Sequence, residues 1–234
     1  ACFDTSYFSQ LPDYTKFYPI PMELAEKNKI IRYGFHGISH QYVAQEAARI
    51  IGRPLQELKL ITAHLGSGSS ITAIEDGTPI DTSMGFTPLE GVMMATRSGS
   101  IDPSIPIFLE EKGYSKQQIR NILNHKSGFK GVSGFTSDMR EIIKETQKEG
   151  KTDDRKRRAG LTLQMYAYQI KKYIGAYTVA LGGLDALVLT GAIAEGAPLI
   201  CKMITHGLEE TLGTFKTLTV PTNEEIAIAK KILG

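Results

Sequence analysis

Glycines and serines fill residues 66–70 (GSGSS), which lie between two stretches rich in β-branched and apolar residues, 58–62 and 69–75. Glycine lets the backbone approach a ligand closely and adopt positive φ, so successive N–H groups can converge on an anion. Serine hydroxyls add further donors. Asp76 and Gly77 then supply a turn signal that would extend the hairpin into a meander. The segment predicts a phosphate-binding hairpin, with an ordinary polar hairpin turn as the alternative.

Two further glycine-bearing segments, 128–134 and 191–196, also lie at predicted element boundaries. The second follows a predicted buried strand, 185–190, and precedes a predicted helix, 198–212. A strand, a small-residue turn and a helix in this order are typical of an α/β nucleotide site. Three such segments in one chain favour a cleft that wraps a phosphorylated ligand.

Acidic residues that could hold a metal ion are scattered along the chain. Mg²⁺ usually takes one or two carboxylates together with phosphate oxygens and water. Asp4 at the end of a predicted strand and Glu224 at the start of a predicted helix would suffice, although Glu224 could instead interact only with the helix dipole. The other candidates are Asp81, Asp102, Asp138, Glu195 and Glu225.

Arg97 lies among small residues, which leaves its guanidinium accessible. A fixed planar cation suits a transferring phosphoryl group or a carboxylate substrate. A solvated loop arginine is the alternative. Arg140 could play the same part, or could merely pair with its neighbour Asp138.

His36 lies between glycine-rich neighbours, an unusual setting for a core side chain. His36 and His40 are four residues apart, and together with His64 they raise the alternative of a zinc site. No fourth ligand has fitting spacing, so zinc is the weaker interpretation.

Strands that alternate with helices predict an α/β protein. The expected strands are 1–5, 30–33, 58–62, 69–75, 78–84, 185–190 and 217–220. The expected helices are 22–29, 39–51 with Ser39 as N-cap, 103–112, 115–125, 138–149, 153–181, 198–212 and 223–233.

The composition of the 234 residues is that of an ordinary globular protein, 41% hydrophobic and 22% charged with a net charge of +2, so a nucleic-acid-binding face is not expected. The basic run 155–158 is interpreted as a solvated helix face. No apolar run approaches the roughly 20 residues of a membrane span. Cys2 and Cys201 are far apart, which favours a reducing, cytoplasmic location. Because the chain begins with Ala1, it is expected to be processed or a piece of something longer.

Six long motifs strongly resemble those of the acetate kinase family and occur in the family's order along nearly the whole chain. They are 32–40 (RYGFHGISH), 63–70 (AHLGSGSS), 81–91 (DTSMGFTPLEG), 96–103 (TRSGSIDP), 131–140 (GVSGFTSDMR) and 221–225 (PTNEE). The resemblance implies an α/β fold of the actin-like ATPase (ribonuclease H-like) type, with a mixed sheet and flanking helices. It also implies reversible transfer of the ATP γ-phosphoryl group to acetate, giving acetyl phosphate and ADP, with Mg²⁺ and in a homodimer. Such transfer depends on positioning and charge neutralisation. Propionate kinase is the alternative activity.

The same resemblance assigns roles to individual residues. His36 would contact the transferring phosphoryl group, and Arg97 would bind substrate carboxylate or phosphate. The pocket for the acetate methyl group would be formed by Phe35 and Pro88, and magnesium or structural support near the phosphates would come from Asp4 and Glu224. The residues that would line the phosphates are His64, Gly66, Ser67, Gly68, Ser69 and Ser70. Those that would border the adenosine are Asp138, Met139, Arg140, Gly191, Ala192, Ile193 and Gly196.

The chain also departs from the family's pattern. Ser67 stands where asparagine is usual, Ala192 and Ala194 add methyl groups near the expected nucleotide, and Gly196 lacks the expected side chain. The family's N-terminal domain, with its first phosphate loop and a second substrate arginine, has no counterpart here. Residues 1–234 are therefore expected to be the C-terminal nucleotide-binding domain alone, poorly active or inactive. The alternative is a nucleotide-binding and dimerisation module without turnover.

Overall fold

The computed structural model describes residues 3–150 and 153–223, and its centre is a five-stranded sheet in the order β3-β2-β1-β4-β5. The strands are β1 (Lys59–Leu65), β2 (Ser69–Glu75), β3 (Thr78–Thr82), β4 (Ala186–Thr190) and β5 (Lys216–Thr219). β1, β2 and β3 form an antiparallel meander, whereas β4 runs parallel to both β1 and β5. The mixed sheet with flanking helices agrees with the fold class that the sequence predicts.

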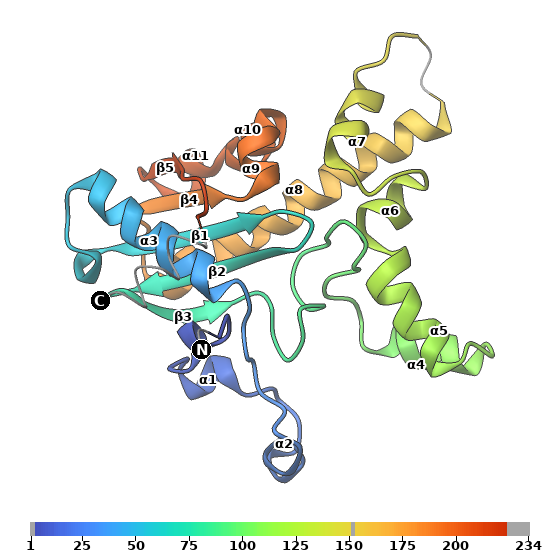
Figure 1. Cartoon of the computed structure of the whole chain (residues 1–234), viewed down its shortest axis with the longest axis horizontal. Coiled ribbons are helices and arrows are strands. Elements are labelled where there is room, and N and C mark those ends of the chain that lie inside the picture. The colour runs from blue at the N-terminus through green and yellow to red at the C-terminus, as the bar shows by residue number, and fades with distance from the viewer. Residues whose placement is uncertain (1–2, 151–152, 224–234) are drawn as a thin grey trace.

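Side chains of the central strands alternate between two apolar cores, as the period of two in a strand requires. On one face, Leu60 and Val188 pack against helix α3 (Gly37–Ile51). On the other face, Ile61 and Leu187 pack in the core that contains residues of α8 (Asp154–Leu181) and α10 (Pro198–Thr205). Figure 1 shows α8 crossing the sheet on the side opposite to α3. Both faces of the central strands are therefore covered, which explains their nearly continuous apolar sequences.

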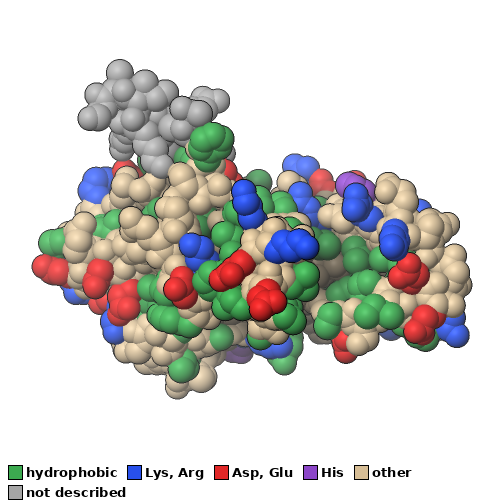
Figure 2. Space-filling view, turned by 90° about the horizontal axis from the view of Figure 1, so that it is seen from below, with side chains coloured by type: hydrophobic (Ala, Val, Ile, Leu, Met, Phe, Trp, Pro, Cys, Tyr) green, Lys and Arg blue, Asp and Glu red, His purple; other side chains and the backbone are tan. Residues whose placement is uncertain are grey.

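The remaining helices connect and flank this sheet, and α4 to α7 extend beyond one end of it (Figure 1). They are η1 (Ser6–Phe8), α1 (Asp13–Lys16), α2 (Met22–Asn28), η2 (Leu55–Glu57), α4 (Ser104–Glu111), α5 (Lys116–Asn121), the π-helical η3 (Ile122–Lys126), α6 (Gly128–Ser133), α7 (Met139–Thr146), α9 (Ala192–Gly196) and α11 (Leu208–Leu212). On the face drawn in Figure 2, Lys and Arg side chains are interspersed with Asp and Glu, so no basic surface dominates that face.

The structure corrects the expected elements before β1. Residues 3–5 form a turn that leads into η1 instead of a strand, and 30–33 make only an isolated bridge between Phe17 and Ile31. Helix α3 starts at Gly37, with His36 as its N-cap, and not after Ser39. Sequence reasoning failed here because the carboxylate of Asp4, far away in the chain, accepts the N–H groups of His36 and Ile38 at 2.6 and 3.3 Å and replaces a local cap.

Two segments expected to be glycine-rich loops are short helices, α6 at Gly128–Ser133 and α9 at Ala192–Gly196. The expected single helix 198–212 is divided into α10 and α11 at Gly207, whose φ is +76°. The expected helix 223–233, with Glu224 and Glu225, lies outside the described residues apart from Asn223. No helix in the described ranges is both long and apolar enough to cross a membrane.

Candidate functional site

The first and third glycine segments meet at the carboxyl ends of two parallel strands. His64 near the end of β1 pairs in register with Thr190 at the end of β4. Gly191 follows with φ +89°, and a Cβ atom there would lie 2.7 Å from the carbonyl oxygen of Leu65. The backbone of the Gly191 turn therefore lies directly against the end of β1. Ligands of open α/β sheets bind beyond such strand ends.

The serine hydroxyls of the hairpin loop are used differently from expectation. Ser69 is buried, and its Oγ bonds the phenol oxygen of Tyr166 at 2.8 Å. Ser70 is also buried, and its Oγ contacts His36 and His40. Ser67 is exposed, while its carbonyl oxygen accepts the N–H of Ala95 at 3.2 Å. The Gly66 N–H donates to the carbonyl oxygen of Gly68 at 2.9 Å, so the loop offers the backbone N–H groups of Ser67 and Gly68 and the Ser67 hydroxyl to a ligand.

Three histidines are packed together beneath this loop. The rings of His36 and His64 stack with centroids 4.3 Å apart. His36 Nδ1 lies 2.9 Å from Ser70 Oγ, and His64 Nδ1 lies 2.9 Å from Ser39 Oγ. His40 is completely buried, with Nδ1 2.7 Å from Thr62 Oγ1 and Nε2 2.7 Å from Ser70 Oγ.

Burial lowers the pKa of all three imidazoles. For His64 the pKa falls to about 3, through burial and the nearby His36. The pKa of His40 is also well below its usual value, and that of His36 is lowered by burial and by Arg97 although Asp4 opposes the change. The cluster is therefore neutral near pH 7. Both nitrogens of His40 are hydrogen-bonded, and no group of three or more His, Cys, Asp or Glu in the described part of the chain could hold a metal ion, so the arrangement does not support the zinc alternative.

These shifts predict that the protein loses stability in mild acid. A histidine held neutral in the fold takes up its proton only on unfolding, so the unfolded state binds more protons below about pH 6.5. The free energy of unfolding should fall as pH decreases from about 6.5 to about 5, by about 1.4 kcal/mol per pH unit for each histidine that stays neutral. Urea unfolding at a series of pH values measures this slope. Constant or rising stability toward pH 5 would show that the cluster is protonated in the fold.

Arg97 approaches the same loop from the segment after β3. Its Nη1 donates to the carbonyl oxygen of Pro88 at 3.2 Å. A Cβ atom placed on Gly68 would lie 3.2 Å from His36 Nε2 and 3.7 Å from Arg97 Nη1. The imidazole of His36, the guanidinium of Arg97 and the backbone of the hairpin loop therefore converge on one point. The two residues expected from the sequence to be catalytic thus lie close together.

The Arg97 segment, residues 94–98, is hydrogen-bonded to the π-helix η3 and to α6. The carbonyl oxygens of Leu123 and Asn124 accept the Ser98 N–H at 2.9 Å and the Thr96 hydroxyl at 2.8 Å. Phe129 N–H at the start of α6 donates to the carbonyl oxygen of Met94 at 2.8 Å. The second glycine segment thus positions the arginine loop, a role that its sequence does not reveal.

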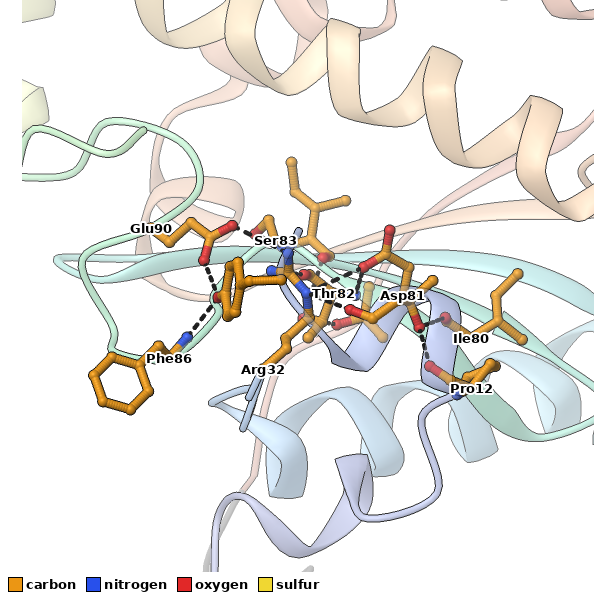
Figure 3. Close-up of polar contacts among 12 residues, drawn as sticks. Pro12, Arg32, Ile80, Asp81, Thr82, Ser83, Phe86 and Glu90 are labelled. Atoms are coloured by element: carbon orange, nitrogen blue, oxygen red, sulfur yellow. Dashed lines mark hydrogen bonds and ion pairs between the residues drawn. The ribbon is translucent and has the colours of Figure 1, made fainter. Parts of the chain in front are cut away.

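A polar cluster around Arg32 fixes the loop that carries Pro88, and sequence reasoning missed its role. Figure 3 shows the guanidinium of Arg32 between Glu90 and Asp81. It donates to Glu90 Oε1 at 3.1 Å and to the carbonyl oxygens of Thr15 and Thr82 at 3.1 and 3.0 Å.

Tyr18 completes this cluster. Burial raises the pKa of Tyr18, so the phenol keeps its proton and donates it to Glu90. The same phenol oxygen accepts the Phe86 N–H at 2.7 Å. A Cβ on Gly85 would collide with both Glu90 and Tyr18, so this glycine is required for the close approach. No residue spacing signals these long-range partners.

The residues assigned to adenosine are divided between two places. Asp138 caps α7, and its carboxylate forms an ion pair with Arg140 at 2.6 Å. In this structure the two side chains therefore pair with each other, which is the alternative to ligand binding that the sequence left open. Hydrogen bonding from Arg140 lowers the pKa of Asp138. Met139 is buried in the core. These residues belong to α7, which packs on α8 beyond the end of the sheet (Figure 1), whereas Gly191, Ala192, Ile193 and Gly196 lie at the strand ends.

The other residues assigned to the substrate and phosphates, Phe35, Pro88 and Asp4, lie near His36 or Arg97. Phe35 is half-buried beside His36 in the chain, and Pro88 contacts Arg97 through its carbonyl oxygen. Asp4 is half-buried, and its carboxylate oxygens accept the N–H groups at the start of α3. Glu224, its expected partner, lies outside the described residues.

Sequence comparison relates this chain to one family. The model of the Acetokinase family matches residues 1–216. The acetate kinase of Caldanaerobacter subterraneus subsp. tengcongensis is 48% identical over an alignment that covers 98% of this chain and 62% of that protein. The acetate kinase of Thermoanaerobacter pseudethanolicus is also 48% identical with the same coverage. The chain thus spans about three-fifths, 62%, of the length of these curated relatives.

Solved structures give the same relationship. The structure superposes on the acetate kinase of Porphyromonas gingivalis with a TM-score of 0.93 at 37% identity, covering 99% of this chain and 62% of that one. A propionate kinase from Francisella tularensis subsp. tularensis gives a TM-score of 0.89 at 38% identity, covering 98% of this chain and 62% of that one. These likenesses confirm the α/β fold of the actin-like ATPase type.

Proposed function

Because this chain belongs to the Acetokinase family, we propose that it is the nucleotide-binding domain of an acetate kinase, a phosphotransferase with a carboxyl group as acceptor. The observation that carries the proposal is the convergence of His36 Nε2 and Arg97 Nη1 on the backbone of Gly68 at the strand ends. In the proposed reaction an acetate oxygen forms a bond to the γ-phosphorus of ATP while the bond to the β–γ bridging oxygen breaks, giving acetyl phosphate and ADP.

The two side chains would divide the work of charge stabilisation. The guanidinium of Arg97 is a permanent cation with donors left over from its bond to Pro88, so it can bind carboxylate or phosphoryl oxygens. The neutral imidazole of His36 can donate one N–H to the transferring group without adding charge. The backbone N–H groups of Ser67 and Gly68 would hold the neighbouring phosphates. Fixed donors of this kind are the main protein contribution to phosphoryl transfer.

The proposed nucleotide lies along the edge where β1 and β4 end. Thr190 Oγ1 at this edge is one of two buried side-chain polar atoms without a hydrogen-bond partner in the described part of the chain. Gly191 brings a bare backbone against Leu65, and Ala192 and Gly196 of α9 are exposed beside it. A ligand polar group near Thr190 would satisfy its hydroxyl. Asp138 and Arg140 are proposed to border the adenosine.

Magnesium is proposed to accompany the nucleotide. Mg²⁺ requires few protein ligands when phosphate oxygens and water complete its shell. Asp4 fits this requirement, because each carboxylate oxygen that accepts an N–H retains a further lone pair. Asp4 would hold the ion with Glu224, and the ion would neutralise phosphate charge when bound.

Acetate is proposed over propionate because the curated relatives cited above are acetate kinases, although the Francisella structure is a propionate kinase. One methylene group changes binding by only about 1–3 kcal/mol, so the two substrates differ little for an apolar pocket. Assembly as a homodimer is also proposed from the family resemblance. A cytoplasmic location is proposed from the wide separation of the two cysteines.

The test is to titrate the chain with Mg-ADP and Mg-ATP in a calorimeter and to assay acetyl phosphate formation with the same sample. We expect saturable binding of both nucleotides, but turnover orders of magnitude below that of a full-length relative, because the titrated chain spans only 62% of the length of these relatives. A folded sample that binds neither nucleotide would refute the nucleotide-binding assignment. Turnover at the rate of the full-length relative would refute the claim that the chain is an incomplete site.

A further inference from the structure

A continuous chain of hydrogen bonds links the middle of β1 to the candidate site. Thr62 Oγ1 lies 2.7 Å from His40 Nδ1, His40 Nε2 lies 2.7 Å from Ser70 Oγ, and Ser70 Oγ lies 2.9 Å from His36 Nδ1. Thr62, His40 and Ser70 are completely buried. In the described part of the chain, these contacts are the only hydrogen bonds of the Thr62 and Ser70 hydroxyls. We call this set the hydroxyl–imidazole chain.

The direction of the protons along this chain follows from counting donors. Each hydroxyl has one proton to donate, and each neutral imidazole has one N–H and one acceptor nitrogen. If Thr62 donates to His40 Nδ1, then His40 donates from Nε2 to Ser70, and Ser70 donates to His36 Nδ1. Every proton between Thr62 and His36 Nδ1 then has an acceptor, and the remaining N–H of His36 lies on Nε2.

The other arrangements leave a buried hydroxyl proton unpaired. In the reverse direction, His36 donates from Nδ1 to Ser70, Ser70 donates to His40, and His40 donates to Thr62, whose own proton has no acceptor in the described residues. If both histidines donate to Ser70, the proton of Ser70 has none. A buried donor without a partner is strongly disfavoured.

We propose that Thr62, acting through His40 and Ser70, fixes the proton of His36 on Nε2, the nitrogen that lies against Gly68 and Arg97. His36 then presents an N–H donor, and not a lone pair, to an anionic oxygen. Thr62, His40 and Ser70 are thus positioning residues for the N–H donor of His36. The inference rests on the proposed kinase function only in assigning that donor to a phosphoryl oxygen. In the reverse tautomer the lone pair of Nε2 would repel a phosphoryl oxygen.

Two contacts fix the position of His36, so the hydroxyl–imidazole chain sets only the tautomer of its ring. Its backbone N–H donates to Asp4 at 2.6 Å, and its ring stacks on His64. His64 is itself oriented by Ser39, whose hydroxyl also contacts Thr222 Oγ1 at 3.0 Å. Burial keeps the pKa of His40 well below its usual value, so the chain passes through a neutral ring with one proton.

The direct test is long-range ¹H–¹⁵N correlation spectroscopy of the imidazoles in the ¹⁵N-labelled chain without ligand, near neutral pH. Protonated and unprotonated ring nitrogens have well-separated ¹⁵N shifts, and loss of one signal set in His36→Gln assigns His36. We expect His36 to carry its proton on Nε2. In Thr62→Val the hydroxyl donor is lost, so the ratio of the Nε2–H to the Nδ1–H form should fall by about tenfold or more.

Two matched variants separate this effect from general damage to the sheet. Thr62→Ser keeps the hydroxyl and should retain the Nε2–H form. Thr72→Val removes another buried hydroxyl, directly across from Thr62 in β2, which bonds Thr82 Oγ1 at 2.9 Å and forms no hydrogen bond with a histidine in the described residues. Its His36 tautomer should be unchanged.

Each outcome decides the proposal. A proton on Nδ1 of His36 in the unsubstituted chain, a doubly protonated ring, or an unchanged ratio in folded Thr62→Val would each overturn it. The measurement on the unsubstituted chain decides the matter even if Thr62→Val does not fold. Since this measurement involves no nucleotide, an Nε2–H signal in a folded chain that binds neither Mg-ADP nor Mg-ATP would refute the proposed function alone.

Discussion

Replacing Arg32 by methionine is expected to lower the free energy of unfolding by about 3–5 kcal/mol, the usual cost of removing one partner from a buried ion pair. The side chain of Arg32 is only 16% exposed, and it lies against two carboxylates, Glu90 and Asp81. Methionine fills much of the volume but leaves both carboxylates and two carbonyl oxygens without their donor. Since domains are stable by only about 5–15 kcal/mol, this loss is large.

The substitution should also release the loop that carries Pro88. Arg32 holds Glu90, and Glu90 accepts the proton of Tyr18, whose oxygen receives the Phe86 N–H. Backbone amide exchange at residues 85–91 should therefore become faster than the loss of global stability explains. Denaturant unfolding and hydrogen exchange measure the two effects separately.

Arg53→Met is the matched control. Arg53 also forms an ion pair with an aspartate, Asp185, at 2.8 Å, but its side chain is 44% exposed. Exposed pairs contribute at most about 1 kcal/mol. If Arg32→Met lowers the free energy of unfolding no more than Arg53→Met does, the Arg32 cluster does not stabilise the fold. The loop that carries Pro88 must then be held by other contacts.

Replacing Gly128 by alanine is the second change with a large expected effect. Gly128 has φ +61°, and a Cβ there would lie 2.0 Å from the carbonyl oxygen of Met94 and 2.6 Å from that of Arg97. The left-handed conformation costs alanine about 1–2 kcal/mol, and the collision adds about 1–3 kcal/mol. We expect a total loss of about 2–5 kcal/mol, with the Arg97 segment pushed away from α6.

Gly113→Ala isolates the conformational part of this loss. Gly113 has φ +89°, and a Cβ atom there would have no neighbouring atom within 4 Å, so only the backbone cost of about 1–2 kcal/mol applies. Thermal or denaturant unfolding of both variants gives the difference. Equal losses in the two variants would mean that α6 does not press against the Arg97 segment. Nucleotide titration of Gly128→Ala then tests whether displacement of Arg97 weakens phosphate binding.

The hairpin around residues 66–70 could be predicted from the sequence because its signals are local. Runs of β-branched and apolar residues define β1 and β2, and the glycines between them define the turn. The same holds for β4 and for the long helix α8, whose bounds differ from the prediction by only one residue at the N-terminal end. The motifs that identify the family are also local in sequence, so the family was predictable as well.

Predictions failed where a residue's partner is distant in the chain. Asp4 replaces the expected cap of Ser39 from 32 residues before His36. Ser70 bonds His36, 34 residues away, and so is unavailable as a donor to phosphate. Side-chain hydroxyls and carboxylates can serve many partners, and a sequence pattern does not rank them.

The sequence by itself determined the strands of the central sheet, the long helix α8, the family and the choice of His36 and Arg97 as the candidate catalytic pair. Only the tertiary structure decided what holds that pair: the Arg32 cluster, the contact of α6 with the Arg97 segment, and the hydroxyl–imidazole chain behind His36. The physical reason is the separation along the chain between the residues that interact. Secondary structure follows from the periodicity of neighbouring residues, whereas the choice of hydrogen-bond partner follows from burial, which is known only once distant segments pack together.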